Sequence, residues 1–323
     1  MNRFAQLITF DDLVHFSPDF IEARNLANRV APSGISVFIT SEPGCGSWQL
    51  ASHIHNRSVR RLNPIQLFQP DKLTPSGQIR QLFGFEEAGV LWPGLLEQAD
   101  GGTLVIEPIE ALAPESQVRL FRALNSREFV PEGSQAWQRM DLRFIAVSRF
   151  SPSDVSRLGM VRDELLFRLE GVPVGLPALR FRVRDIIPLA RRFMDRLAAE
   201  NGQVSRSPDR SAAEALIGYS WPGNDEELFQ VMERVMTLGD HTTLKASDLV
   251  SPVTGQSISA PVVNTDVFTM ENDRLITLNE AREFLFRKAM KLTGNNADEA
   301  ARLLGIGRAT AFRMQRKEKG DGK

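Results

Sequence analysis

The chain has 323 residues, and at roughly 150 residues per domain this length predicts about two domains. Its 39 Lys and Arg residues balance 40 Asp and Glu residues to a formal charge of −1, so any surface for nucleic acid or membrane must be local. Hydrophobic residues make up 42% and charged residues 24%, which is ordinary for a globular protein and excludes a disordered one.

The single cysteine, Cys45, excludes an intramolecular disulfide framework and a cysteine-based zinc site. His53 and His55 are two residues apart on a predicted helix and do not share a face, so no metal site is expected. The amino-terminal residues are not typical of a signal peptide, and no segment reaches the roughly 20 apolar residues of a membrane helix. We therefore expect a soluble, cytoplasmic protein with no membrane partner.

Apolar runs of strand length alternate with helical patterns up to about residue 175. Gln117–Leu124 places its apolar residues on one helical face. The alternation predicts an α/β fold for residues 1–175, a parallel sheet with helices on its faces. The runs rich in β-branched residues, which we predict to be buried strands, are Ile35–Ile39, Thr103–Ile106 and Leu142–Val147.

Residues 176–250 lack strand patterns and predict a small helical subdomain. Residues 251–276, rich in Ser, Thr, Pro and Val, predict a linker, with an edge strand at Val262–Val263 as the alternative. The segments with helical periodicity are Asp185–Glu200, Arg210–Gly218 and Asp225–Thr237.

Residues 277–323 are helical again, and their charge differs from that of the rest of the chain. From Arg302 onward there are seven Lys and Arg residues and two Asp and Glu residues, a local charge of +5. A first predicted helix ends at Gly305, which supplies a turn, and Arg308–Lys317 forms a second. Two helices with small residues and a short glycine turn are typical of a helix-turn-helix.

The residue types in the second of these helices indicate that the chain binds double-stranded DNA. Its Arg and Thr side chains can reach base edges in the major groove, and the cations near its end suit phosphates. The alternative is a helical hairpin used only for dimerisation. One short module reads a half-site, so we expect a homodimer or higher oligomer, with Leu278–Leu292 suited to dimerisation. The candidate DNA-binding residues are Asn295, Asn296, Arg302, Arg308, Thr310, Arg313, Arg316 and Lys317.

The segment GNNADEAARLLGIGRATAFR, residues 294–313, is similar to the Fis-type helix-turn-helix of bacterial enhancer-binding proteins, the AAA+ activators of sigma-54 RNA polymerase. The resemblance covers nearly the whole chain. It implies an AAA+ P-loop core at 1–175, a helical lid at 176–250 and a DNA-binding domain at 277–323, as in phage-shock-type members that lack a sensor domain. Further motifs agree in order and spacing: LFG at Leu82–Gly84, EQADGGTL at Glu97–Leu104, VRDELLFRL at Val161–Leu169, LPALRFRVRDI at Leu176–Ile186 and WPGN at Trp221–Asn224.

The phosphate loop departs from the family's pattern. That pattern is G-E-x-G-T-G-K-E, and Ser41–Trp48 here is SEPGCGSW. Gly44 and Gly46 are kept, so backbone amides can still form an anion nest before the helix. Ser47 stands where the family has the lysine for the β- and γ-phosphates, and losing one such charge-assisted contact costs on the order of 1.5–3 kcal/mol. Trp48 replaces the acidic residue that follows.

Other nucleotide-site motifs also differ. The family's Asp-Glu pair becomes Glu107-Pro108, in which Glu107 keeps a carboxylate for Mg²⁺ but Pro108 cannot polarise water. The sensor asparagine falls on Arg149 and the sensor arginine on Glu226. We therefore expect that the chain is not an enzyme, its ATPase activity being lost or very weak. No cofactor is expected, and any binding of ATP and Mg²⁺ should be weak. The positions of this altered site are Glu42, Gly44, Cys45, Gly46, Ser47, Trp48, Glu107, Pro108, Arg149 and Glu226.

The loop with which the family contacts sigma-54, G-A-F-T-G-A, has no counterpart here. Phe85–Leu96 stands in its place, is several residues shorter and lacks the motif. We predict that Leu91 and Trp92 are buried against the sheet; the alternative is an apolar contact for another partner.

Arg162 and Arg168 match the arginine fingers with which, in the family, one subunit reaches into its neighbour's nucleotide site. An alternative is a helix-surface ion pair between Glu164 and Arg168. Retained fingers would suit a mixed ring with an intact AAA+ paralogue.

The sequence favours a DNA-binding transcription regulator on a degenerate AAA+ scaffold. One alternative is an ATP-dependent activator of sigma-54 RNA polymerase with an atypical site. The other is a non-catalytic subunit that modulates rings of an intact activator. The residues do not distinguish an activator from a repressor.

Overall fold

The computed structural model describes residues 3–13, 16–238 and 243–258, and single positions or short runs further on. These later residues are 285–287, 289, 290, 293, 296, 297, 300, 301, 304, 311, 314 and 315. The chain divides into two compact units, Met1–Val262 and Val263–Lys323, which are described separately.

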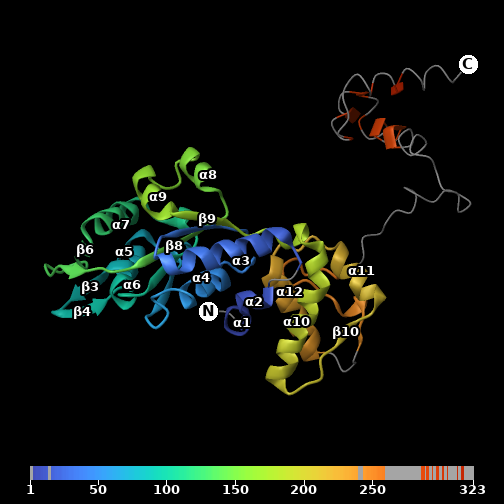
Figure 1. Cartoon of the computed structure of the whole chain (residues 1–323), viewed down its shortest axis with the longest axis horizontal. Helices are drawn as coiled ribbons and strands as arrows, with labels where there is room; N and C mark the ends of the chain where they lie inside the picture. Colours follow the sequence, from blue (N-terminus) through green and yellow to red (C-terminus); the bar gives the residue numbers. More distant parts are fainter. Residues whose placement is uncertain are drawn as a thin grey trace, which may run out of the picture. The chain divides into compact units, whose positions relative to one another are not determined.

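The first unit is built on a parallel sheet in the order β2-β5-β8-β1-β9 (Figure 1). Its strands are β1 (Val37–Thr40), β2 (Ile65–Phe68), β5 (Thr103–Ile106), β8 (Arg143–Ser148) and β9 (Val172–Gly175). Small two-stranded pairs are formed by β3 (Gly84–Glu87) with β4 (Val90–Pro93), β6 (Glu128–Phe129) with β7 (Gln138–Arg139), and β10 (Ser207–Pro208) with β11 (Thr243–Leu244).

The helices of the α/β part are α3 (Pro18–Val30), α4 (Ser47–Asn56), α5 (Pro75–Phe83), α6 (Leu95–Gln98), α7 (Pro114–Ser126), α8 (Pro152–Arg157) and α9 (Asp163–Glu170). The short α1 (Arg3–Leu7) and α2 (Phe10–Leu13) precede them. The remaining helices, α10 (Val183–Asn201), α11 (Arg210–Gly218) and α12 (Asn224–Leu238), form a helical lid.

Each central strand is buried on both faces. Val37 and Ile39 join one apolar cluster, whereas Phe38 between them joins the other, as the alternation of side chains along a strand requires. Helices α3 and α4 cover the first face, and α5, α7 and α9 cover the second. The predicted α/β class is confirmed. The first predicted strand, Ile35–Ile39, is observed two residues later, because Gly34 at φ 68° ends a 3-10 turn immediately before it.

The lid packs on the amino-terminal helices as well as on itself. The ring of Phe4 lies 6.0 Å from that of Phe193 and 5.5 Å from that of Phe229. Arg182 and Asp225 form an ion pair at 2.5 Å with both side chains fully buried. Residues 251–258, at the start of the predicted linker, pack on the lid through Ile258, which is 1% exposed. The rest of that linker lies outside the described residues.

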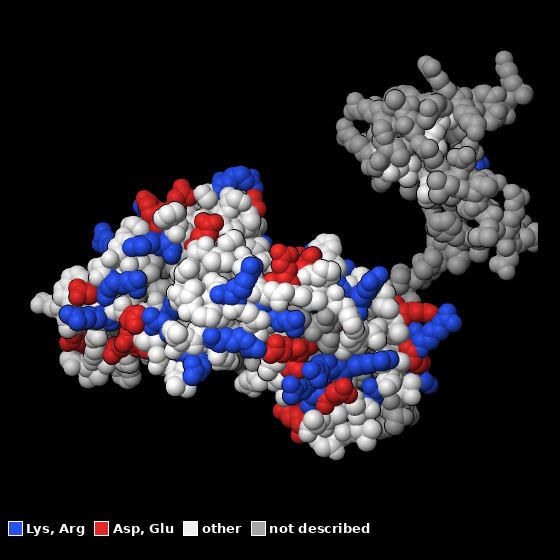
Figure 2. Space-filling view, in the orientation of Figure 1, with Lys and Arg blue, Asp and Glu red and all other residues white. Residues whose placement is uncertain are grey.

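Charges on the visible face of the first unit are mixed. Figure 2 shows Lys and Arg interspersed with Asp and Glu, in keeping with the formal charge of −1. This face shows no field of a single sign, and long-range attraction of a charged partner is not expected from it.

A β-hairpin, β3–β4, forms most of the segment Phe85–Leu96, which the sequence predicted to stand in place of a sigma-54 loop. Ala88 and Gly89, at φ 51° and 77°, form its two-residue turn, the backbone that a tight hairpin requires. The prediction that Leu91 and Trp92 are buried is wrong: their exposed fractions are 38% and 54%. Pairing with β3 lifts them off the sheet, and Trp92 stacks on Phe85 at 6.0 Å instead.

In the second unit, the described apolar residues form a small core. Its buried members are Phe286, Ala289, Met290, Ala297, Ala300, Ala301 and Ala311. Of the candidate DNA-binding residues, Asn296 is described and is exposed, and its carbonyl accepts the Ala300 amide at 3.0 Å. The others, Asn295, Arg302, Arg308, Thr310, Arg313, Arg316 and Lys317, lie outside the described residues.

Candidate functional site

The loop between β1 and α4 has a backbone that only glycine can supply. Gly44 and Gly46 have φ values of 82° and 86°, in the left-handed region. A Cβ atom on Gly44 would lie 2.2 Å from the Gly223 carbonyl oxygen, so the close approach also excludes any side chain there. The two glycines singled out in the sequence therefore shape this loop.

The loop leads directly into the amino terminus of α4. The first amides of a helix have no partner within it, and together with the helix dipole they attract an anion. Because α4 starts at Ser47, these amides belong to the residues in which the phosphate loop was expected. The backbone at this point therefore fits a phosphate group.

The side chain of Ser47 is hydrogen-bonded to the side chain of Glu107. Its hydroxyl donates a hydrogen bond to Glu107 Oε1, directly after β5. Burial raises the pKa of Glu107, and the bond from Ser47 partly offsets that rise. The position at which the sequence resemblance predicts a lost lysine is thus a neutral hydroxyl, hydrogen-bonded to Glu107.

A pocket of about 420 Å³ opens beside this pair, within the size range of small-molecule sites. It lies at the carboxyl ends of β2, β5, β8 and β1, where parallel sheets bind ligands. Of the altered nucleotide-site positions, its lining includes Gly44, Gly46, Ser47, Trp48, Glu107, Pro108, Arg149 and Glu226.

Besides Glu107, two of those positions, Arg149 and Glu226, bring ionisable side chains to the pocket. Arg149, directly after β8, has Nε 3.7 Å from Glu110 Oε1, and its side chain is 62% exposed. The backbone amide of Glu226 donates to the Gly44 carbonyl at 3.1 Å. The charge reversal predicted at the sensor arginine position therefore lies next to the phosphate loop.

Further contacts join the phosphate loop to the lid. Arg180 donates to both carboxylate oxygens of Glu42, at 2.5 and 2.7 Å, which holds the pKa of Glu42 below its usual range. Asn224 donates from Nδ2 to the Pro43 carbonyl at 3.0 Å. The loop conformation thus depends on the lid.

Cys45 is part of this loop but faces away from solvent. It is fully buried in the apolar cluster beneath the loop, and burial raises the pKa of its thiol. A buried, protonated thiol is a poor nucleophile. The geometry fits a small apolar residue at this position.

The arginine-finger positions lie near α9. Arg162 precedes the helix and has Nε 3.7 Å from Glu164 Oε2, with its side chain 54% exposed. Arg168 donates from Nε to Asn125 Oδ1 at 3.1 Å. The expected pair between Glu164 and Arg168 is therefore wrong, because each residue has another partner on the α7–α9 surface.

Sequence reasoning missed the residues that the end of β2 brings to the pocket. Asp71 and Lys72 line it, and Lys72 Nζ donates to Gln69 Oε1 at 2.8 Å. The signal available was an acidic-basic pair four residues past an apolar run, but Ile65–Phe68 was not identified as a strand. Among the described residues, no group of three or more His, Cys, Asp and Glu side chains could hold a metal ion. Within the same residues, no helix is long and apolar enough to cross a membrane.

Two family models match the chain in succession. Residues 13–175 match the Sigma-54 interaction domain, and residues 180–265 match the AAA+ ATPase lid domain.

Curated relatives match over most of the chain. The transcriptional regulatory protein ZraR of Klebsiella oxytoca is 33% identical over 92% of this chain and 67% of its own length. The alginate biosynthesis transcriptional regulatory protein AlgB of Pseudomonas syringae pv. tomato is 31% identical over 95% of this chain and 67% of its own.

Among solved structures, NtrX from Brucella abortus in complex with ADP superposes with a TM-score of 0.70 at 28% identity, over 95% of this chain and 70% of that one. Its complex with ATP gives a TM-score of 0.68. The AAA+ α/β architecture with a helical lid is therefore shown.

These matches overturn one expectation. The prediction that the chain is not an enzyme is wrong, because its lid matches that of an AAA+ ATPase and a similar structure holds ATP or ADP. The prediction weighed side chains alone. The glycine loop and the sheet edge are features of the backbone, and both are present together with the pocket beside them.

Proposed function

Since the chain belongs to the family of the Sigma-54 interaction domain, we propose that it is a DNA-binding transcription regulator whose AAA+ core binds ATP. The observation that carries this proposal is the glycine loop at the amino terminus of α4, which opens on a pocket of nucleotide size. Ser47 brings no charge to the phosphates, so the proposed affinity for ATP is lower than with a lysine there.

The second part of the proposal concerns DNA. The basic helix Arg308–Lys317 follows a small-residue helix in the sequence, and the relatives are named as transcriptional regulators. We assign the reading of a DNA half-site to this segment, with a homodimer or higher oligomer covering a whole site. Such a protein acts in the cytoplasm, on the RNA polymerase that uses sigma-54.

The contact with polymerase differs from the family's pattern in this proposal. The β3–β4 hairpin replaces the G-A-F-T-G-A loop and presents Val90, Leu91 and Trp92 to solvent. An exposed apolar tip of this kind suits a protein partner. Arg162, with its side chain 54% exposed, is available to a neighbouring subunit in an oligomer.

The test is a titration of the full-length protein. ATP binding is measured by calorimetry, phosphate release is followed in parallel, and DNA binding is measured by footprinting on the promoter next to the gene. We expect saturable ATP binding and a protected palindrome. Arg308→Ala and Arg313→Ala should each weaken specific DNA binding about five- to 150-fold. A full-length protein that binds no ATP, or protects no DNA, contradicts the corresponding half of the proposal.

A further inference from the structure

The pocket lacks the phosphate-loop lysine but still contains positive charge. Among the described residues that line it, the cations are Lys72 and Arg149, which follow β2 and β8. Glu107 follows β5, which lies between those two strands in the sheet. The two cations therefore stand on either side of the carboxylate that Ser47 contacts.

Arg149 is already engaged with an acidic partner. Its Nε lies 3.7 Å from Glu110 Oε1, and its backbone amide lies 3.5 Å from the same oxygen. A guanidinium held in this way would have to leave a carboxylate to bind a phosphate. That exchange offsets part of what the new contact contributes, a small part because the Arg149 side chain is 62% exposed and solvent screens the pair.

The ammonium group of Lys72 has a partner that would compete less with a phosphate than Glu110 does at Arg149. Its ammonium group donates to the neutral amide oxygen of Gln69 at 2.8 Å, and within the described residues it forms no ion pair. Its charge acts on the carboxyl of Glu107 and partly offsets the rise in the pKa of that group. The positive charge of Lys72 therefore acts on the carboxyl group that accepts the hydrogen bond from Ser47.

A lysine side chain is well suited to reach further into the site. It is exposed here, and its four-carbon stem is flexible, so the ammonium can move to a phosphate oxygen without a change in backbone. Lysine binds phosphate as a point charge, which requires proximity rather than a fixed geometry.

We propose that Lys72, carried in by the end of β2, is the cation that binds the terminal phosphates of ATP in this chain, in place of the lysine missing at Ser47. This inference rests on the proposed binding of ATP. Lys72 follows β2, whereas the phosphate loop follows β1, so the proposed phosphate-binding lysine comes from a different part of the sheet edge.

The experiment compares ATP, ADP and AMP binding by calorimetry in four full-length variants. Lys72→Gln removes the charge, and Lys72→Arg keeps it. Arg61→Gln is the matched control, since it removes one positive charge from the loop before β2, outside the residues that line the pocket. Ser47→Lys in the Lys72→Gln background restores the family's lysine. Thermal melting of each variant confirms that it is folded.

We expect Lys72→Gln to weaken ATP binding about ten- to a hundredfold and AMP binding much less, because the lost contact is to the terminal phosphates. Arg61→Gln should bind ATP as the wild type does, Lys72→Arg should lose less affinity than Lys72→Gln because it keeps the charge, and Ser47→Lys should recover the loss. If Lys72→Gln binds ATP as tightly as Arg61→Gln, or loses ATP and AMP equally, the inference is overturned and the proposed function stands. If the wild-type protein binds no ATP, the proposed function itself fails.

Discussion

Arg143 brings a cation into the base of the sheet, where it is 1% exposed. Its guanidinium donates to three backbone carbonyls: those of Ile35 at 3.0 Å, Ala31 at 2.8 Å and Val30 at 3.1 Å. Burial lowers the pKa of Arg143 to about 10, so the side chain is still protonated at neutral pH. Arg143 thus supplies hydrogen-bond donors to backbone carbonyls at the end of α3 and in the turn that follows it.

Arg143→Met should destabilise the fold by about 3 kcal/mol. Methionine fills a similar volume but removes the donor to the Ile35 and Ala31 carbonyls, whereas the Val30 carbonyl keeps a hydrogen bond from the Ser33 hydroxyl; each unsatisfied buried polar group costs roughly 1–3 kcal/mol. The free energy of unfolding is measured by urea denaturation. Arg210→Met, at a side chain that is 93% exposed, is the control and should leave the stability close to that of the wild type. Equal stabilities of the two variants would contradict the role assigned to Arg143.

At this scale the sequence identified residues that motifs mark and missed those that only the fold brings together. Gly44, Gly46 and Ser47 were found because they follow each other in one loop. Lys72 is separated from them by more than twenty residues and reaches the pocket through the order of the strands. Arg143 lies near the start of an apolar run, and the sequence pattern there does not predict that its side chain donates hydrogen bonds to backbone carbonyls.

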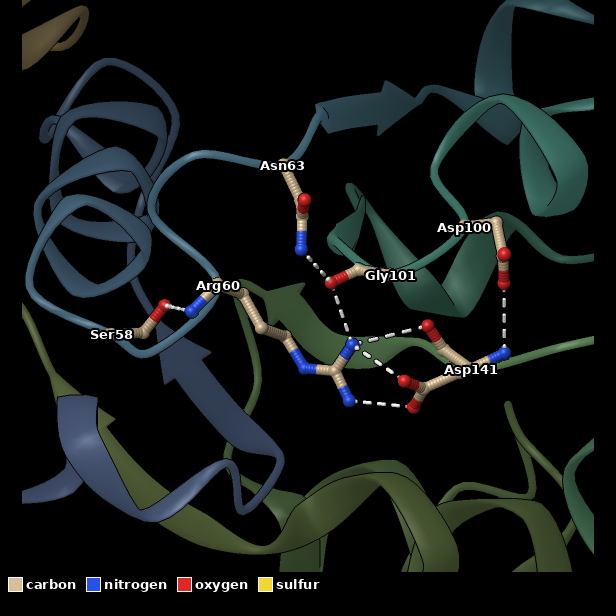
Figure 3. Close-up of polar contacts among 6 residues, drawn as sticks. All are labelled: Ser58, Arg60, Asn63, Asp100, Gly101 and Asp141. Atoms are coloured by element: carbon tan, nitrogen blue, oxygen red, sulfur yellow. Dashed lines mark hydrogen bonds and ion pairs between the residues drawn. The ribbon is translucent and has the colours of Figure 1, made fainter.

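The segment between α4 and β2 is held by a polar network at the amino edge of the sheet (Figure 3). Arg60 donates to the Gly101 carbonyl at 2.7 Å and to the carboxylate of Asp141 at 2.6 Å. Asn63 donates to the same Gly101 carbonyl at 2.8 Å. The bond from Arg60 holds the pKa of Asp141 below its usual range.

Arg60→Ala should cost about 1 kcal/mol near neutral pH, a modest value because Asp141 is largely exposed and solvent screens the pair. A carboxyl whose pKa is lowered by folding contributes stability above its unfolded pKa, and this contribution is lost as pH falls through the folded pKa. The difference between wild type and Arg60→Ala should therefore shrink as the pH falls below the ordinary aspartate pKa of about 3.9. Urea midpoints at several pH values measure it, with Arg61→Ala as control. A difference that is constant with pH would exclude a contribution from the ion pair.

The hairpin shows what patterning fails to predict at the scale of elements. Apolar letters at Leu91 and Trp92 favoured burial, but the tight turn at Ala88 and Gly89 directs the chain away from the sheet. Long elements with clear periodicity were predicted well: Arg210–Gly218 is α11 as observed, and Gln117–Leu124 lies within α7. The apolar face of such a helix follows from the spacing of its own residues. Whether the hairpin residues are buried depends instead on the direction in which the turn sends the chain.

At the scale of the whole molecule, the contacts of the first unit are made within residues 1–262. Ile258 completes the lid, so a fragment that ends at Val262 keeps the described core intact. We predict that fragment 1–262 unfolds in one cooperative transition at the Tm of the first unit in the full chain. Calorimetry measures this. Ending the fragment at Leu249 instead should lower the Tm by several degrees, because Ile258 and Ser251 are then missing from the lid. Identical melting of the two fragments would count against the role given to Ile258.

The hydrogen bond from the Glu226 amide to the Gly44 carbonyl couples the phosphate loop to helix α12. The next residue of that helix, Glu227, accepts a hydrogen bond from the hydroxyl of Ser251, in the segment 251–258 that packs on the lid. A ligand that displaces the loop must either break the first bond or carry α12 with it. In the second case Ser251 moves with Glu227, and occupancy at the sheet edge displaces the segment 251–258, which closes the lid through Ile258.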